Sequence, residues 1–174
     1  MPKSYAEQAQ GFAGQISDLA SHTIETALNG EASAEIPFGY FVKQSAGRTA
    51  DGTPALAALP SNAADIMLGC VVHSNQYNRE TDLGEDGILP DVQMGVMRRG
   101  RMYAYADAAV AVTDTPYIRI TANSAKLPGM VTNGADSAKA VLFYGARFLC
   151  ATTAAGPVEI EFDMNTYLSG TQTD

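Results

Sequence analysis

The sequence has little of what nucleic-acid-binding and membrane-binding proteins need. Its 174 residues include 11 lysines and arginines against 19 acidic residues, for a formal net charge of −8. Nucleic acid is bound by clustered basic side chains that neutralise phosphates, so this charge argues against such a partner. It would also repel an anionic membrane surface. We therefore expect neither nucleic acid nor a membrane as a partner.

Long hydrophobic runs are also missing. No run approaches the roughly 18 apolar residues that a membrane-spanning helix needs, and the first residues lack the apolar core of a signal peptide. The chain is therefore expected to be made and to fold in a cytoplasm. Cys70 and Cys150 lie in separate apolar runs without zinc-ligand spacing, which favours buried, reduced thiols.

Catalytic motifs are absent as well. The sequence has no nucleophile elbow, P-loop or dinucleotide-binding fingerprint. His22 and His73 lie in different segments, and neither has a partner at metal-ligand spacing. Glu159 and Glu161 share one face of a predicted strand, where solvation is a better explanation than a glycosidase pair. We expect no enzyme activity and no cofactor.

One acidic segment superficially resembles a calcium-binding loop. It runs from Asp82 to Gly87, but Gly84 stands where the loop needs an oxygen ligand. Gln93 stands where the closing bidentate glutamate belongs. We therefore expect a solvated acidic turn and no bound metal.

The clearest pattern that is present is alternation. Apolar and polar residues alternate through Val92–Ala106 on both sides of Gly100, as is typical of a half-buried β-strand. Glycine accepts positive φ without penalty, so Gly100 is the natural place for a reversal or a bulge. Arg98, Arg99 and Arg101 flank it and form the only basic cluster. This stretch is expected to be the centre of an all-β domain.

The remaining chain reads mostly as short strands and loops. Residues 16–28 fit either a helical face or a strand. The turn signal Asn29-Gly30 slightly favours the strand, in a hairpin with residues 36–42. Pro37 indicates that the second strand of this hairpin lies at a sheet edge. Residues 44–65 and 74–91 are predicted loops. Further strands are predicted at residues 66–72, 117–121, 141–151 and 158–164.

These elements predict an all-β fold, an antiparallel barrel or sandwich of jelly-roll type with long loops. The predicted organisation is an extended N-terminal arm at residues 1–20, a single β-domain at 21–165 and a flexible C-terminal tail at 166–174.

Three blocks of sequence resemble the structural cement, or capsid decoration, proteins of tailed bacteriophages. Together they span about residues 10–165, and Thr113 departs from a glycine common in the family. The blocks are Ile36–Gly39 with Leu68–Ser74, Val96–Tyr103 with Asp114–Arg119, and Gly145–Leu149 with Ala155–Phe162.

The resemblance implies a structural protein without an active site. Cement proteins bind the outside of the capsid, bridge neighbouring major capsid subunits and resist the pressure of packaged DNA. The implied location is therefore the capsid exterior of a virion, with the major capsid protein as partner. Self-association is also implied, as a homotrimer or else a dimer.

Two sets of residues are the candidate capsid or subunit interface. The N-terminal arm can add a strand to a partner or lay Phe12, Ile16 and Leu19 into a capsid groove, because an extended segment gains main-chain hydrogen bonds. Arg98, Arg99 and Arg101 are candidate salt-bridge donors between subunits or toward the capsid.

Two other classes of protein remain open at this point. One is a head-fibre or tail-associated β-module that binds a receptor or carbohydrate, for which Tyr77 is the best aromatic residue in a loop. The other is a small-ligand-binding barrel or a hydrolase, which would need convergent polar residues in a pocket.

Overall fold

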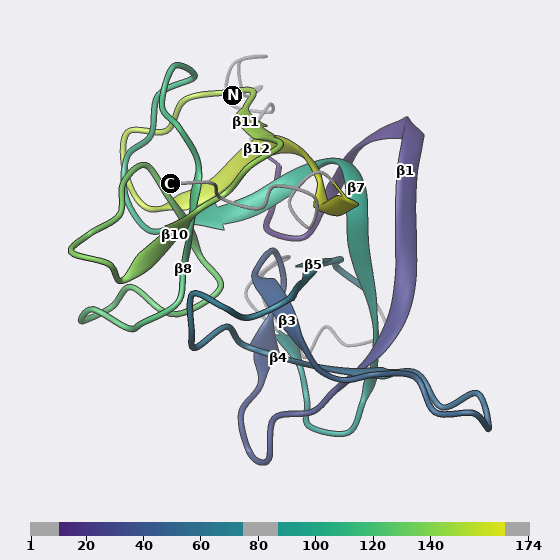
Figure 1. Cartoon of the computed structure of the whole chain (residues 1–174). Helices are drawn as coiled ribbons and strands as arrows, with labels where there is room; N and C mark the ends of the chain where they lie inside the picture. The colour runs from purple at the N-terminus through teal and green to yellow at the C-terminus, as the bar shows by residue number, and fades with distance from the viewer. Residues whose placement is uncertain (1–10, 75–86, 166–174) are drawn as a thin grey trace, which may run out of the picture.

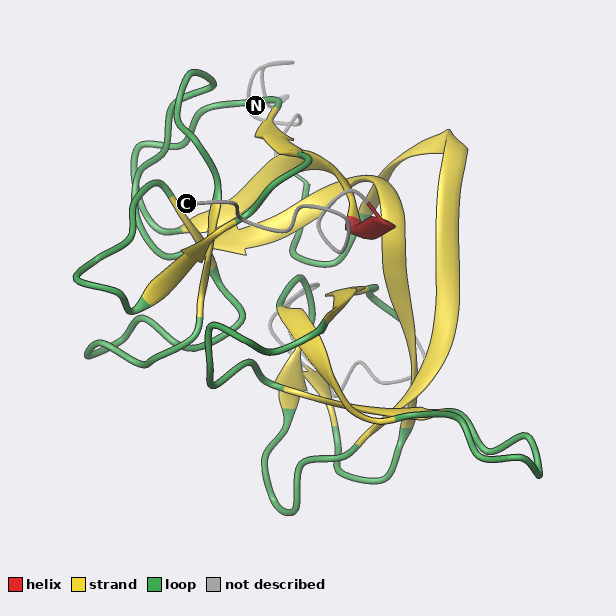
Figure 2. Ribbon diagram, in the orientation of Figure 1, coloured by secondary structure: helices red, strands yellow, loops and turns green. Residues whose placement is uncertain are grey.

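The computed structural model describes residues 11–74 and 87–165. Almost all of their regular structure is β, which confirms the predicted fold class (Figures 1 and 2). No helix among these residues is long and apolar enough to cross a membrane. The strands are β1 Ile16–Asn29, β2 Ile36–Pro37, β3 Phe41–Ala46, β4 Ala55–Ala58, β5 Met67–Val71, β6 Gly87–Ile88, β7 Gln93–Ala106, β8 Tyr117–Arg119, β9 Val131–Thr132, β10 Ala140–Leu142, β11 Ala146–Phe148 and β12 Gly156–Asp163.

Five strands close into a barrel. They pair in the order β1-β4-β3-β5-β7, and a further antiparallel pairing of β1 with β7 completes the ring. The β1–β4 pairing is parallel, with Ala27 opposite Ala55. Closure satisfies main-chain groups that an open sheet would leave at its edges. A first core cluster contains Ala27, Ile36, Phe38, Val42, Ala57, Leu68, Val71, Ile88, Met94 and Val96.

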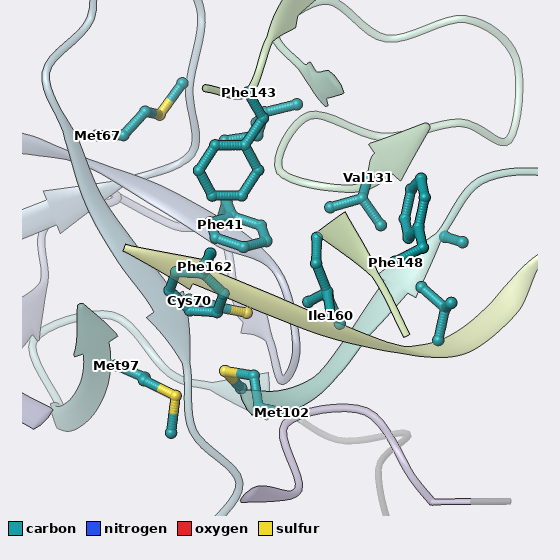
Figure 3. Close-up of a cluster of buried hydrophobic side chains, with 14 of the residues drawn as sticks. Phe41, Met67, Cys70, Met97, Met102, Val131, Phe143, Phe148, Ile160 and Phe162 are labelled. Atoms are coloured by element: carbon teal, nitrogen blue, oxygen red, sulfur yellow. The ribbon is translucent and has the colours of Figure 1, made fainter. Parts of the chain in front are cut away.

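A second layer forms where β7 continues beyond the barrel. Its later half pairs with β12, β12 pairs with β11, and Ala106 joins β9 and through it β8 and β10. A second core lies here, in which the rings of Phe41, Phe143 and Phe162 contact one another at centroid distances of 4.9, 5.1 and 5.8 Å (Figure 3). Strand β7 is therefore common to both layers.

The predicted reversal at Gly100 is wrong. Strand β7 runs through this glycine without turning back, although the glycine has a φ of 138°. The irregularity lies on the neighbouring strand, since Asp18 pairs with Arg101 and Thr23 with Arg99, which places residues 19–22 of β1 opposite Gly100 alone. The alternative prediction, a bulge at this place, describes the pairing better.

The predicted hairpin across Asn29-Gly30 is also wrong. Residues 16–29 are a strand, but β1 pairs with β4 and β7, while β2 pairs with β6. The buried Asn29 side chain donates to the carbonyls of Ala34 and Ile88 and accepts from the amide of Glu31. These hydrogen bonds stabilise the connection between β1 and β2, which is longer than a two-residue hairpin turn.

Other predictions differ in detail. The expected strand at 36–42 is interrupted at Gly39, whose φ is 76°, so that β2 and β3 are separate. The expected loop at 44–65 contains β4. Strand β5 is buried at all five positions, and β12 alternates between buried and half-buried residues, as predicted.

The domain boundaries fall partly outside the described residues. Residues 1–10 of the predicted arm, the tail at 166–174, and residues 75–86, which include Tyr77 and most of the calcium-like segment, lie there. Residues 16–20, which the prediction assigned to the arm, belong to β1, where Ile16 pairs with Met102.

A candidate docking groove

A groove of about 430 Å³ lies between β1, β7, β11 and β12. We call it the arginine groove, because three arginines and three carboxylates supply its charged side chains. Its lining residues are Asp18, Ser21, Arg99, Gly100, Arg101, Gly145, Ala146, Arg147, Glu161, Phe162 and Asp163.

Strand pairing brings these charges together. Arg101 lies opposite Asp18 on β1 and opposite Glu161 on β12. Arg147 on β11 also lies opposite Glu161. Opposite charges at directly paired positions attract across the strands, so the register of the sheet itself assembles the cluster.

Glu161 is the centre of the cluster. Its Oε1 accepts a hydrogen bond from Nε of Arg101 at 2.9 Å, and its Oε2 accepts one from Nε of Arg147 at 2.6 Å. Nη1 of Arg101 lies 3.5 Å from Oδ2 of Asp18. A fourth pair, looser than these, joins Nε of Arg99 to Oδ2 of Asp163 at 3.7 Å.

The electrostatic shifts follow from these contacts. The hydrogen bond from Arg101 is the main contact that lowers the pKa of Glu161, and the bond from Arg147 adds to it. The same bond to Glu161 raises the pKa of Arg101. Glu161 and Arg101 therefore stay charged over a wider pH range than they would without each other. The pairs are only half-buried, and exposed ion pairs add little to folding stability.

Two of the arginines keep donors available for a partner. The side chains of Arg99 and Arg147 are 57% and 65% exposed, and each has only its Nε in an ion pair among the described residues. Guanidinium groups present five N–H donors in a planar fork that matches carboxylates. The groove can therefore bind an acidic segment while its internal pairs persist.

The polar side chains of the groove are a serine, three carboxylates and three arginines. Its lining contains no histidine or cysteine. Among the residues that the structure describes, no group of three or more histidine, cysteine or acidic side chains could hold a metal ion.

The structure separates the three arginines predicted to act together. Arg99 and Arg101 line the arginine groove, whereas Arg98 lies outside it, with Nη1 3.3 Å from Oε2 of Glu25. All three are paired within the chain. Their use between subunits or toward the capsid remains a prediction.

The predicted apolar residues of the arm lie along the start of the sheet. The ring of Phe12 packs edge-on against His73 with centroids 4.7 Å apart, and Ile16 packs against the second core. Leu19 belongs to β1 by its backbone. Near Phe12, the amide of Gly14 donates to the carbonyl of Tyr103 at 2.7 Å, so this part of the chain is held to β7.

Sequence reasoning did not connect four residues of the groove. Asp18, Arg147, Glu161 and Asp163 are far from the basic cluster in the chain, and only the register of β1, β11 and β12 against β7 and one another unites them. One usable signal was present, namely the row of acidic residues on the outward face of β12.

Comparison with known proteins agrees with the fold. The family model described as structural cement protein (E217 gp24/Pam3 gp6) matches residues 1–163. A chain of the solved structure "The capsid of Myoviridae Phage XM1" superposes with a TM-score of 0.63 at 20% identity, covering 94% of each chain. At that identity the likeness concerns the fold. No curated protein matches.

Proposed function

Since the chain belongs to the structural cement protein family of phages, we propose that it binds the outer surface of a tailed-phage head and bridges neighbouring major capsid subunits. The family gives the protein a structural, capsid-stabilising role. That the protein bridges capsid subunits is the more specific part of the proposal. It rests on the arginine groove, which has exposed guanidinium donors on a protein whose net charge is −8.

The charge distribution supports an acidic docking segment in the capsid partner. Arg99 and Arg147 stand at the surface of the groove with unpaired N–H donors among the described residues. An acidic loop or strand of a major capsid subunit complements these donors, whereas a basic segment would find the three carboxylates of the groove already paired with its arginines. Each contact is weak alone, and repetition over the lattice supplies avidity.

The described part of the predicted arm has much of its main chain engaged within the domain. Residues 16–20 belong to β1, and Gly14 and Gln15 exchange main-chain hydrogen bonds with Tyr103. Strand addition to a capsid subunit by these residues would first require those hydrogen bonds to break. Self-association as a homotrimer or a dimer would place several grooves on one oligomer and so raise its avidity for the capsid further.

Sedimentation with undecorated capsids tests the function. Purified protein is mixed with capsids of its own phage lacking the cement protein, and the bound fraction is measured against protein concentration. Saturable co-sedimentation, together with a raised melting temperature of the capsid, is expected. Absence of binding to its own capsid contradicts the proposed function.

A charge-matched pair of variants tests the groove. R99Q/R147Q removes two positive charges from the groove, and R48E changes the net charge equally at an exposed residue outside it. We expect about tenfold weaker capsid binding for R99Q/R147Q, because hydrogen bonds from charged donors are lost. R48E should bind like the wild type. Equal binding by the wild type and both variants would exclude the groove as the capsid-binding surface, but it would not contradict the capsid-stabilising role.

A further inference from the structure

The sequence contains two Asn-Gly dipeptides, and the fold gives them opposite surroundings. Asn29-Gly30 stands at the end of β1, and Asn133-Gly134 directly follows β9. In such a dipeptide the glycine has no side chain to hinder its main-chain nitrogen, which can attack the side-chain carbonyl carbon of the asparagine. We propose that Asn133 is a site of spontaneous deamidation in the folded protein, whereas Asn29 is protected by the fold.

The reaction requires only the two residues and water. The main-chain nitrogen of Gly134 gives up its proton to solvent and forms a bond to Cγ of Asn133, which closes an imide ring. The bond from Cγ to Nδ2 breaks, and Nδ2 takes a proton from solvent and leaves as ammonia. Water then adds to one of the two imide carbonyls and opens the ring, which gives aspartate or isoaspartate. A carboxylate thus replaces an amide without oxidation or reduction.

Asn133 has the freedom that this reaction needs. The residue is exposed, and a Cβ placed on Gly134 would meet no atom within 4 Å. No carbonyl among the described residues accepts a hydrogen bond from the Gly134 amide. Within this part of the chain, the attacking nitrogen therefore has no main-chain hydrogen bond to break.

Asn29 lacks this freedom. It is fully buried, and its Nδ2 donates to the carbonyl of Ile88 at 2.7 Å and to that of Ala34 at 3.1 Å. The amide of Gly30, which would supply the attacking nitrogen, donates to the carbonyl of Ala57 at 2.8 Å. Closing the ring would break these hydrogen bonds inside the protein, where unpaired polar groups are costly.

A weaker restraint acts on Asn133. Its Nδ2 donates to Oδ2 of Asp114 at 2.9 Å and lies 3.4 Å from the carbonyl oxygen of Ala109, which is long for a hydrogen bond. Both contacts are exposed, so water can replace the donor when the side chain moves. We therefore expect Asp114 to slow the reaction at Asn133 without preventing it.

Deamidation would place a carboxylate where Asp114 now has a donor. The amide of Ala111 and then the side chain of Asn133 lower the pKa of Asp114 through their hydrogen bonds. The new carboxylate removes the second bond and repels the charge of Asp114, so the pKa of Asp114 should rise. Nuclear magnetic resonance of the aged protein measures this, and an unchanged pKa would contradict it.

Mass spectrometry of ageing protein tests the proposal. The full chain is kept at mildly alkaline pH, folded in one sample and unfolded in urea in another, and the deamidated fraction of each Asn-Gly peptide is followed with time. In the folded protein we expect steady conversion of Asn133 and conversion of Asn29 at least about tenfold slower, because its hydrogen bonds must break first. In urea the two rates should be similar.

Two variants test the restraint by Asp114. D114A removes the acceptor and should speed the conversion of Asn133 by about two- to tenfold, the factor that corresponds to one net hydrogen bond. D51A removes another exposed aspartate that accepts hydrogen bonds within its own loop, and it should leave the rate at Asn133 unchanged. A rate for D114A no higher than that for D51A would contradict the restraint.

Three results would overturn the proposal itself. They are the absence of conversion at Asn133 in the folded protein, equal rates at Asn29 and Asn133 there, and a difference between the two that persists in urea. None of these measurements involves capsids, so they are independent of the proposed function.

Discussion

Met97 and Met102 point into the same hydrophobic core, although they stand five positions apart, an odd spacing, on one continuous strand. Side chains at such a spacing leave a flat strand on opposite faces. Strand β7 must therefore twist about its own axis between them, so that its two faces exchange. Gly100, with its φ of 138°, lies within this twisted part. Figure 3 shows both methionines beside the second core. Because of this twist, a single strand contributes side chains to both hydrophobic cores.

Replacing Gly100 by alanine should destabilise the protein. A Cβ there would lie 2.9 Å from Cβ of His22 and 3.1 Å from Sδ of Met97, and the φ is one that other residues rarely adopt. We expect G100A to lower the free energy of unfolding by about 2–3 kcal/mol. Urea denaturation followed by circular dichroism measures this.

Gly134 provides the matched control. A Cβ added there meets no atom within 4 Å, so G134A should change the free energy of unfolding by no more than about 0.5 kcal/mol. Similar losses in both variants would show that the turn at Gly100 needs no glycine.

Breaking the buried pair of Arg119 and Asp107 should be costly. Both side chains are fully buried, so R119M leaves a buried carboxylate without its cation. We expect a loss of about 3–5 kcal/mol in the free energy of unfolding. The double variant D107N/R119M removes both charges and should recover part of the loss. Equal stability of R119M and the wild type would contradict this account.

Asp136 should contribute to acid sensitivity. Hydrogen bonds from Asn123 and then from Arg119 lower the pKa of Asp136 from its ordinary value of 3.8. A carboxyl whose pKa is depressed by folding stabilises the folded protein above its unfolded pKa, and this stabilisation is lost as pH falls through the folded pKa. Stability should therefore decline from about pH 4 downward.

The variant D136N isolates this contribution. Its free energy of unfolding, measured in urea at a series of pH values, should vary less steeply below about pH 4 than that of the wild type. Parallel curves for the two proteins would refute the assignment. Direct titration of the Asp136 carboxyl by nuclear magnetic resonance should give a pKa below 3.8.

The two thiols should differ in reactivity. Cys70 is fully buried, and its burial raises its pKa well above the usual thiol value, so little thiolate forms. Cys150 is only partly buried. Iodoacetamide at about pH 8 should alkylate Cys150 in the folded protein and both cysteines in the unfolded protein, as read by peptide mass spectrometry. Rapid alkylation of Cys70 in the folded state would contradict the packing of β5.

Local patterns identified the strands whose environment is uniform along their length. Alternation placed β12, and a continuous apolar run placed β5, because each strand keeps the same burial pattern from end to end. The turn signals at Asn29-Gly30 and Gly100 failed for a different reason. A glycine in the sequence indicates only that an unusual φ is allowed there. Whether the chain reverses or merely twists at that glycine depends on which strands pair on either side of it.

The site was predictable only in part. The basic cluster at residues 98–101 was visible in the sequence, and two of its arginines do line the groove. Arg147 and Glu161 join them through strand registers set by distant residues.

The continuity of β7 has a mechanical consequence. The strand is hydrogen-bonded to β1 and β5 in the barrel and to β12 in the outer layer, and Gly100 and the arginine groove lie where the pairings with β1 and β12 overlap. A force applied along β7 at the groove is resisted in shear, with many hydrogen bonds loaded together. Peeling, which breaks bonds one after another at lower force, would require the force to act across the strand. A load applied along β7 at the groove therefore passes into both layers at once.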